Sequence, residues 1–131
     1  MIRTLTLFAM IFIFSGVISA QTRSGTWLKG TWSGTGYQID NNETWTMRLT
    51  VTGRKYSIAY PSLKCGGVWK LVNIGSSIAT FKELITYGKD LCTDRGKVTI
   101  ERLSSRQINF RYANPGKPEI TASAILKKGS Q

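Results

Sequence analysis

The sequence predicts an all-β protein, an antiparallel meander of about eight strands that forms a closed or nearly closed small barrel with one disulfide. Residues 44–52 alternate strictly between apolar and polar side chains, as a strand with one buried face does. Similar short segments recur along the chain with turn-forming residues between them, and no segment has a helical period. A two-sheet sandwich is the alternative, but a barrel is favoured because closure removes both sheet edges.

The first twenty residues have the layout of a secretory signal peptide. Arg3 precedes an apolar run, and small residues end it at Ala20, the expected cleavage position. A retained membrane anchor is the alternative, although the run is short for a span and is interrupted by Ser15 and Gly16. We therefore expect residues 21–131 to form a single β-barrel domain that is exported to the periplasm or the extracellular space, with no membrane span after cleavage.

The expected strands can be placed in chain order from their periodicity and their turns. The first, residues 26–39, is rich in tryptophan and glycine and is expected to bend near Gly34. The turn that follows it is Asp40-Asn41-Asn42, and Pro61 ends the third strand. The remaining strands are expected at residues 44–52, 55–60, 65–74, 78–87, 97–103, 107–113 and 120–126.

The central hairpin, residues 65–87, organises the rest of the chain. A fold at Gly75–Ser77 brings its far ends together, and these ends carry the two cysteines, Cys65 and Cys92. An exported chain with two cysteines most simply forms one disulfide. On the chain-entropy model, closing this loop stabilises the fold by roughly 3–4 kcal/mol.

Leu28-Lys29-Gly30-Thr31-Trp32 resembles the G-x-W opening strand of calycin-type barrels. That group includes lipocalins, avidins and small secreted bacterial inhibitors of metalloproteases. The tryptophan closes the base of the barrel in those families. The resemblance therefore implies that Trp32 closes one end of the barrel here.

A second resemblance covers residues 60–112. The pattern SLKCGG-x-W-x-L, then ATFKE-x-ITYG-x-x-x-C, then GKVTIE is similar to a small exported bacterial domain. That domain occurs alone or at the extracytoplasmic end of larger proteins, including some serine/threonine kinases. The resemblance implies a fold and a compartment, and it carries no biochemical activity with it.

Catalysis is not expected. The chain contains no histidine, which excludes a histidine-based triad, a histidine metal site and a histidine proton shuttle. Asp90 and Asp94 lie among basic loop residues, where solvated charge explains them. Glu83 falls at an inward position of its strand, so it is either an interior carboxylate with a partner or an anchor for a ligand. No metal and no cofactor are expected.

Binding is the expected role, and an inhibitor-like or partner-binding protein is narrowly favoured over a carrier of a small ligand. An inhibitor-like or partner-binding protein would work through its loops around a filled barrel. A carrier of a small hydrophobic or aromatic ligand would instead have an open interior lined by aromatic tips. The aromatic residues expected in the core or at a ligand are Trp32, Trp45, Tyr56, Tyr60, Trp69, Phe81, Tyr87, Phe110 and Tyr112.

The strong positive charge suggests a third form of binding. The chain has 18 Lys and Arg against 7 Asp and Glu, a formal charge of +11. Such a surface attracts anionic glycans or lipopolysaccharide by charge, and Arg48, Arg102 and Arg111 are expected to form one outer stripe. Export argues against nucleic acid as the physiological partner.

Overall fold

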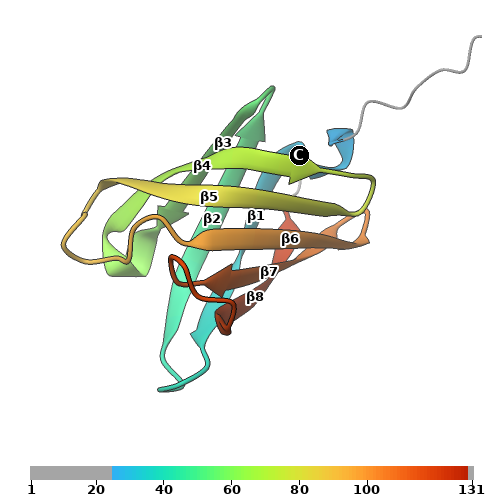
Figure 1. Ribbon diagram of the computed structural model, residues 1–131. Helices are drawn as coiled ribbons and strands as arrows, with labels where there is room; N and C mark the ends of the chain where they lie inside the picture. Colours follow the sequence, from blue (N-terminus) through green and yellow to red (C-terminus); the bar gives the residue numbers. More distant parts are fainter. Residues whose placement is uncertain (1–24, 130–131) are drawn as a thin grey trace, which may run out of the picture.

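Eight antiparallel strands follow one another around a closed barrel (Figure 1). The computed structural model describes residues 25–129, so the expected signal peptide and its cleavage position lie outside the described residues. Two short 3-10 helices, η1 (Thr26–Leu28) and η2 (Pro61–Leu63), complete the fold. The strands are β1 (Gly30–Gln38), β2 (Thr44–Thr52), β3 (Lys55–Tyr60), β4 (Cys65–Ile74), β5 (Ile78–Tyr87), β6 (Lys97–Ser104), β7 (Gln107–Ala113) and β8 (Ile120–Lys128).

Pairing between the first and last strands closes the sheet, which confirms the barrel and excludes the sandwich. β1 lies between β2 and β8, with Trp32 opposite Leu49 on one side and Lys128 on the other. Every strand therefore has two neighbours, and no open sheet edge remains among the described strands. The period-two pattern of residues 44–52 predicted the buried face of β2 correctly, since Met47, Leu49 and Val51 all point into the core.

One end of the barrel is closed by Trp32. Its side chain is 0% exposed, and its indole Nε1 donates to the carbonyl oxygen of Leu28 at 2.9 Å. The Lys128 ammonium lies 5.5 Å from the centre of the indole ring, within the range of a cation–π contact. Leu28 comes from η1, so the expectation of a continuous strand from residue 26 was wrong. These residues turn across the barrel end because their burial against Trp32 outweighs strand pairing.

The middle of the barrel is filled by a chain of aromatic contacts. The ring of Phe81 packs against Tyr56 at 4.8 Å and against Trp69 at 5.4 Å, measured between ring centres. Phe110 continues this chain, with ring centres 5.7 Å from Trp69 and 6.4 Å from Tyr112. The expected aromatic core is therefore present as one connected cluster through the middle of the barrel.

Tyr87 departs from that expectation. It ends β5 beside Gly66 of β4, and its side chain is 51% exposed. The ladder between β4 and β5 shifts register at Gly66/Gly67, where the pairing becomes irregular. The outer face of the same hairpin is also exposed to solvent, since Val72 is 71% exposed.

The disulfide joins Cys65, the first residue of β4, to Cys92 in the loop between β5 and β6. It confirms the pairing expected from the hairpin. Gly88 begins this loop with φ of 63°, and a Cβ at this position would overlap the backbone beside Cys65. The loop is therefore held against β4 at the barrel end opposite Trp32.

No helix within residues 25–129 has the length and hydropathy needed to cross a membrane.

We predict that Trp32→Ala lowers the free energy of unfolding by about 3–5 kcal/mol, because it opens a cavity at the closed end. Trp27→Ala should cost much less, because Trp27 is only partly buried and its Nε1 donates to the carbonyl oxygen of Gly75 at the surface. Urea denaturation of both variants measures the difference. Equal costs would contradict the role assigned to Trp32.

We also predict that the folded protein shows no free thiol, and that reduction lowers its melting temperature by several degrees or more. The reason is the loss of the constraint between Cys65 and Cys92 in the unfolded chain. Thiol labelling with and without denaturant, together with calorimetry, provides the check. Stoichiometric labelling of the unreduced, folded protein would rule out the disulfide.

Candidate functional site

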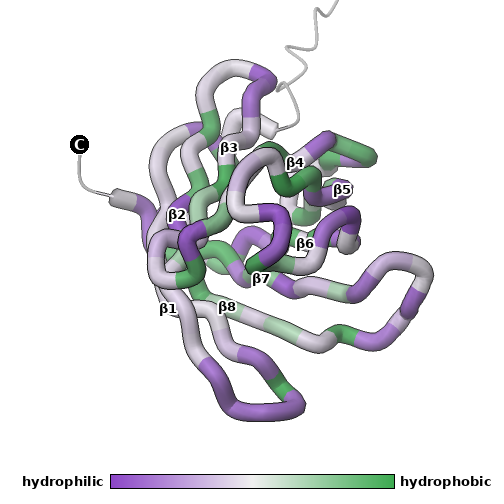
Figure 2. The backbone as a smooth tube through the Cα atoms, turned by 90° about the vertical axis from the view of Figure 1, so that its left-hand side faces the viewer, coloured by the Kyte–Doolittle hydropathy of each residue, from purple (hydrophilic) through white to green (hydrophobic). Residues whose placement is uncertain are grey.

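A cavity of about 320 Å³ opens at the end of the barrel opposite Trp32. Loops and the inner faces of several strands form its wall. The loop between β1 and β2, which supplies Asn41 and Glu43 to this wall, is hydrophilic and projects from the barrel (Figure 2). This volume lies at the small end of the range for ligand pockets. The lining residues are Gln38, Asn41, Glu43, Trp45, Tyr60, Leu63, Glu83, Leu91, Cys92, Thr93, Phe110, Tyr112 and Ala122.

Glu83 lines this cavity from within the barrel and is only 2% exposed. Its Oε2 atom accepts two hydrogen bonds, one from the Tyr60 hydroxyl and one from Trp69 Nε1 at 2.8 Å. Within the described residues, neither a cation nor a donor contacts Oε1. The inward position expected for Glu83 is therefore correct, and its partners are two neutral donors that occupy one of its two oxygens.

Burial raises the pKa of the Glu83 carboxyl, because the charged form is removed from water. The hydrogen bonds from Tyr60 and Trp69 offset part of this effect, while the nearby charge of Asp94 adds to it. The pKa of Tyr60 is raised well above its usual value by burial and then by the Glu83 charge, and the pKa of Tyr112 is raised for the same two reasons. Both tyrosines therefore remain neutral hydrogen-bonding groups beside the carboxyl.

Trp45 of β2 also lines the cavity. It lies directly across from Gly36 on β1, where any Cβ would overlap its indole ring. Glycine at this position therefore lets the ring lie against the backbone of β1. Among the buried side-chain nitrogen and oxygen atoms of residues 25–129, Trp45 Nε1 alone has no hydrogen-bond partner. A buried donor without a partner is costly, and at the wall of a cavity it is available to a ligand.

The loop between β5 and β6, residues 88–96, is fixed in place over one side of the cavity. Its Asp94 carboxylate accepts hydrogen bonds from the backbone N–H groups of Ile85 at 2.9 Å and Arg95 at 2.8 Å. These bonds lower the pKa of Asp94, led by the one from Ile85. The Glu83 backbone also pairs with this loop, donating to Gly96 and accepting from Arg95. Together with the disulfide, these contacts hold the loop that carries Leu91 and Thr93.

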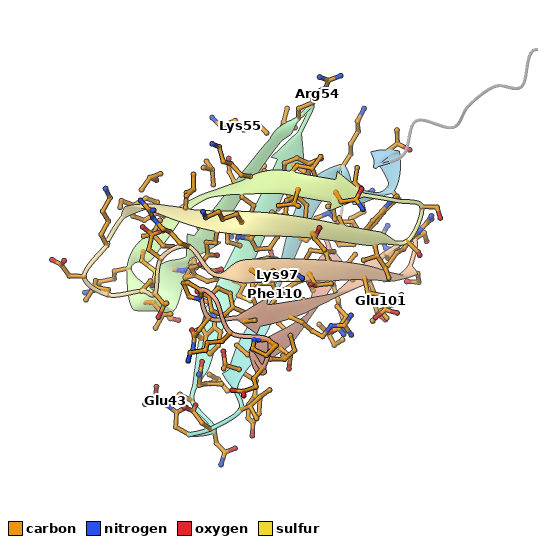
Figure 3. The ribbon with its side chains drawn as sticks, viewed as in Figure 1. Glu43, Arg54, Lys55, Lys97, Glu101 and Phe110 are labelled. Carbon is orange, nitrogen blue, oxygen red and sulfur yellow. A yellow bond between two sulfur atoms is a disulfide. The ribbon has the colours of Figure 1, made fainter. Side chains whose placement is uncertain are left out.

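Most of the chain's carboxylates lie at this end of the barrel. Five of the seven carboxylates lie in loops at the cavity end, and Glu83 faces the cavity. In Figure 3, Glu43 lies at the tip of the β1–β2 loop, while Arg54 and Lys55 lie at the far end of the molecule. The seventh carboxylate, Glu101, pairs with Arg111 on the outer face at 3.3 Å. The loop carboxylates are Asp40, Glu43, Asp90, Asp94 and Glu119.

The structure brings together some of the residues singled out from the sequence and separates others. Trp45, Phe110 and Tyr112 line the cavity with Glu83, and Tyr60 joins them. Trp69 reaches Glu83 from β4, whereas Trp32, Tyr56 and Phe81 belong to the packed interior. Tyr87 neither lines the cavity nor joins the buried cluster.

The expected arginine stripe is not present as one surface. Arg48 lies on β2 beside Ser33 and Ala59, and β8 and β1 separate this strand from β7, which carries Arg111. Arg102 and Arg111 are on neighbouring strands but are not opposite each other. Their positions depend on the order of strands around the barrel, which periodicity does not give.

A lysine row instead crosses the outer face. Lys82 of β5 lies opposite Lys70 of β4 on one side and opposite Lys97 of β6 on the other. Lys82 and Lys97 also line a shallow groove of about 500 Å³ with Arg95 and Lys117. Like charges directly opposite each other in a sheet are destabilising, so this row costs stability.

The described residues contain no group of three or more side chains suited to hold a metal ion. Comparisons of the chain with protein-family models, curated proteins and solved structures gave no match. The site is therefore interpreted from its own geometry.

Sequence reasoning missed three features, two at the cavity end of the barrel and one at the end closed by Trp32. Asp94 was interpreted as solvated charge, because no periodicity shows which backbone groups a loop carboxylate contacts. The unpaired Nε1 of Trp45 follows from its register with Gly36, which the sequence does not give. Lys128 over Trp32 depends on closure between β1 and β8.

We predict that Glu83→Gln is at least as stable as the wild-type protein at pH 7. The glutamine carbonyl oxygen can accept both hydrogen bonds now made to Oε2, and no buried charge remains. Because the pKa of Glu83 is raised on folding, the folded state binds the extra proton, so wild-type stability should fall as pH rises from about 4.3 through the raised pKa. Urea denaturation at several pH values measures both curves, and the variant should lack this component. A variant that is less stable at every pH would show that Glu83 serves the fold.

Proposed function

We propose that this protein is a non-catalytic binding protein that takes a small ligand in the cavity at the open end of its barrel. The observation that carries the proposal is the cavity itself, with the Trp45 indole N–H and Glu83 Oε1 both lacking protein partners. Hydrogen-bonding groups left unfilled beside aromatic walls are typical of ligand sites. The cavity lies at one end of a barrel whose other interior side chains form one buried hydrophobic cluster.

This proposal places a small ligand ahead of a protein partner, reversing the order expected from the sequence. A partner-binding protein that works through its loops has no need of an unfilled interior. Here the loops are instead fastened down around the opening, by the disulfide and by Asp94. Their arrangement supports a role in shaping the cavity.

The proposed place of action is an exported one, the periplasm or the extracellular space. The disulfide between Cys65 and Cys92 is compatible with an oxidising compartment. The layout of the first twenty residues supports the same proposal.

A fluorescent neutral probe, N-phenyl-1-naphthylamine, tests the proposal in the full chain with its disulfide intact. We expect saturable binding near one probe per protein, with a rise in fluorescence as the probe enters the cavity. Ala122→Met extends a side chain into the cavity and should weaken binding at least tenfold. Val72→Met adds a similar side chain on the exposed outer face and should leave binding unchanged. Equal binding by all three proteins would place the probe elsewhere and count against the cavity.

The lysine row favours a second function, charge-driven binding of an anionic glycan or lipopolysaccharide. Clusters of like charge kept despite their cost mark surfaces that meet the opposite charge, and the groove beside the row adds Arg95 and Lys117. Such binding weakens as salt shortens the screening length.

Two triple variants that change the net charge by the same amount test this second function. Lys70→Glu, Lys82→Glu and Lys97→Glu together should remove most retention on heparin at low salt. The control triple, Arg48→Glu, Arg54→Glu and Arg102→Glu, changes the net charge equally at scattered exposed positions and should reduce retention less. Equal losses would show that only net charge matters.

A further inference from the structure

The cavity lining has a charge opposite to that of the chain as a whole. Lys and Arg outnumber Asp and Glu by 18 to 7 in the sequence, yet the charged residues that line the cavity are Glu43 and Glu83. No lysine or arginine is among its lining residues in the described part of the chain. An anionic ligand would meet only repulsion from these side chains, whereas a cationic ligand would be attracted.

Glu83 lacks the partner that a buried carboxylate normally has. Within residues 25–129 the one ion pair is that of Glu101 with Arg111, on the outer face of the barrel. Glu83 receives two neutral donors on Oε2 and none on Oε1, although it is almost fully buried. Buried charges in proteins are paired, so the missing cation is the group that would complete this site.

The remaining lining suits a cation that carries apolar substituents. The aromatic side chains of Trp45, Phe110 and Tyr112 share the cavity with Glu83, and aromatic faces attract ammonium groups. The volume of about 320 Å³ restricts the ligand to a small molecule. The loops around the opening carry five carboxylates against four cations, so the attraction for a cation comes mainly from the two carboxylates that line the cavity, Glu43 and Glu83.

We propose that the cavity binds a small organic cation, an aromatic or alkyl ammonium compound whose charged nitrogen lies against Glu83 Oε1. This inference rests on the proposed function and names the chemical class of its ligand. Glu83 supplies the counter-charge, Tyr60 and Trp69 hold its carboxylate in place through Oε2, and the aromatic walls surround the rest of the molecule.

Three probes of similar size and different charge test the proposal by calorimetry with the full, oxidised chain. They are 2-phenylethylammonium, neutral 2-phenylethanol and anionic 3-phenylpropanoate. We expect the cation to bind at least tenfold more tightly than the alcohol, and the anion to show no measurable binding. The N-phenyl-1-naphthylamine assay, run by competition, shows whether each probe enters the cavity.

Two single-charge variants locate the origin of the preference. Glu83→Gln keeps an acceptor for Tyr60 and Trp69 and removes the charge, so the cation should lose its advantage while the alcohol binds within about twofold of wild type. Glu101→Gln removes the same charge from the outer face and should keep the cation preference. Circular dichroism spectra like that of the wild type, with cooperative melting, confirm that both variants are folded.

The pH dependence of the wild-type protein provides a test that needs no variant. The ionised form of Glu83 binds the cation, so affinity should rise with pH, and binding near the raised pKa should release a proton. The titratable groups facing Glu83 are Tyr60 from β3, Tyr112 from β7 and Asp94 from the β5–β6 loop. The tyrosines stay neutral and Asp94 stays ionised between about pH 5 and 8, so none of these three groups accounts for the change.

The outcomes separate this inference from the function on which it rests. Equal binding of cation and alcohol, or a cation preference that survives Glu83→Gln, overturns the cation site and leaves a neutral-ligand cavity. Absence of cation binding while the fluorescent probe still binds has the same meaning. Absence of binding by every probe, including N-phenyl-1-naphthylamine, overturns both proposals.

Discussion

Closure of the sheet between β1 and β8 is the constraint on which the rest of the molecule depends. An eight-stranded barrel encloses a volume that side chains can just fill, or that can hold one small ligand. In this protein the two possibilities are divided between the two ends. Trp32, capped by η1 and Lys128, fills the first end, and an aromatic cluster fills the middle. The second end is wider than its side chains can fill, and a cavity remains there.

The groups around this cavity cost stability that the closed end and the disulfide offset. Glu83 is a buried carboxylate whose partners are two neutral donors and no cation, and Trp45 holds a buried N–H without an acceptor. In a barrel that served only as a scaffold, an apolar side chain could replace either residue with little loss of stability. Both groups line the same cavity, and this is the argument for a ligand there.

An acidic cavity lining and a basic outer face give the molecule two different surfaces. A net positive chain places most of its carboxylates at the cavity end, and its lysine row lies on the outer face of β4, β5 and β6. The two surfaces suit ligands of opposite charge, and different side chains form them. The disulfide belongs to the first of them, because Cys92 lies in the cavity wall.

The sequence by itself determined the strands, the cysteine pair and the inward direction of Glu83, because period-two patterning and turn residues are local signals. Residues 44–52 and 107–113 show this plainly, and their strands begin and end where expected. The absence of histidine also excluded histidine-based chemistry without any structure.

Tertiary structure alone decided which residues from distant strands meet. Glu83 and Tyr60 come from strands that are not neighbours, Trp45 meets Gly36 through register, and Arg48 is separated from Arg111 by barrel order. The cavity has the same origin, because the space left inside a closed barrel depends on all eight strands together.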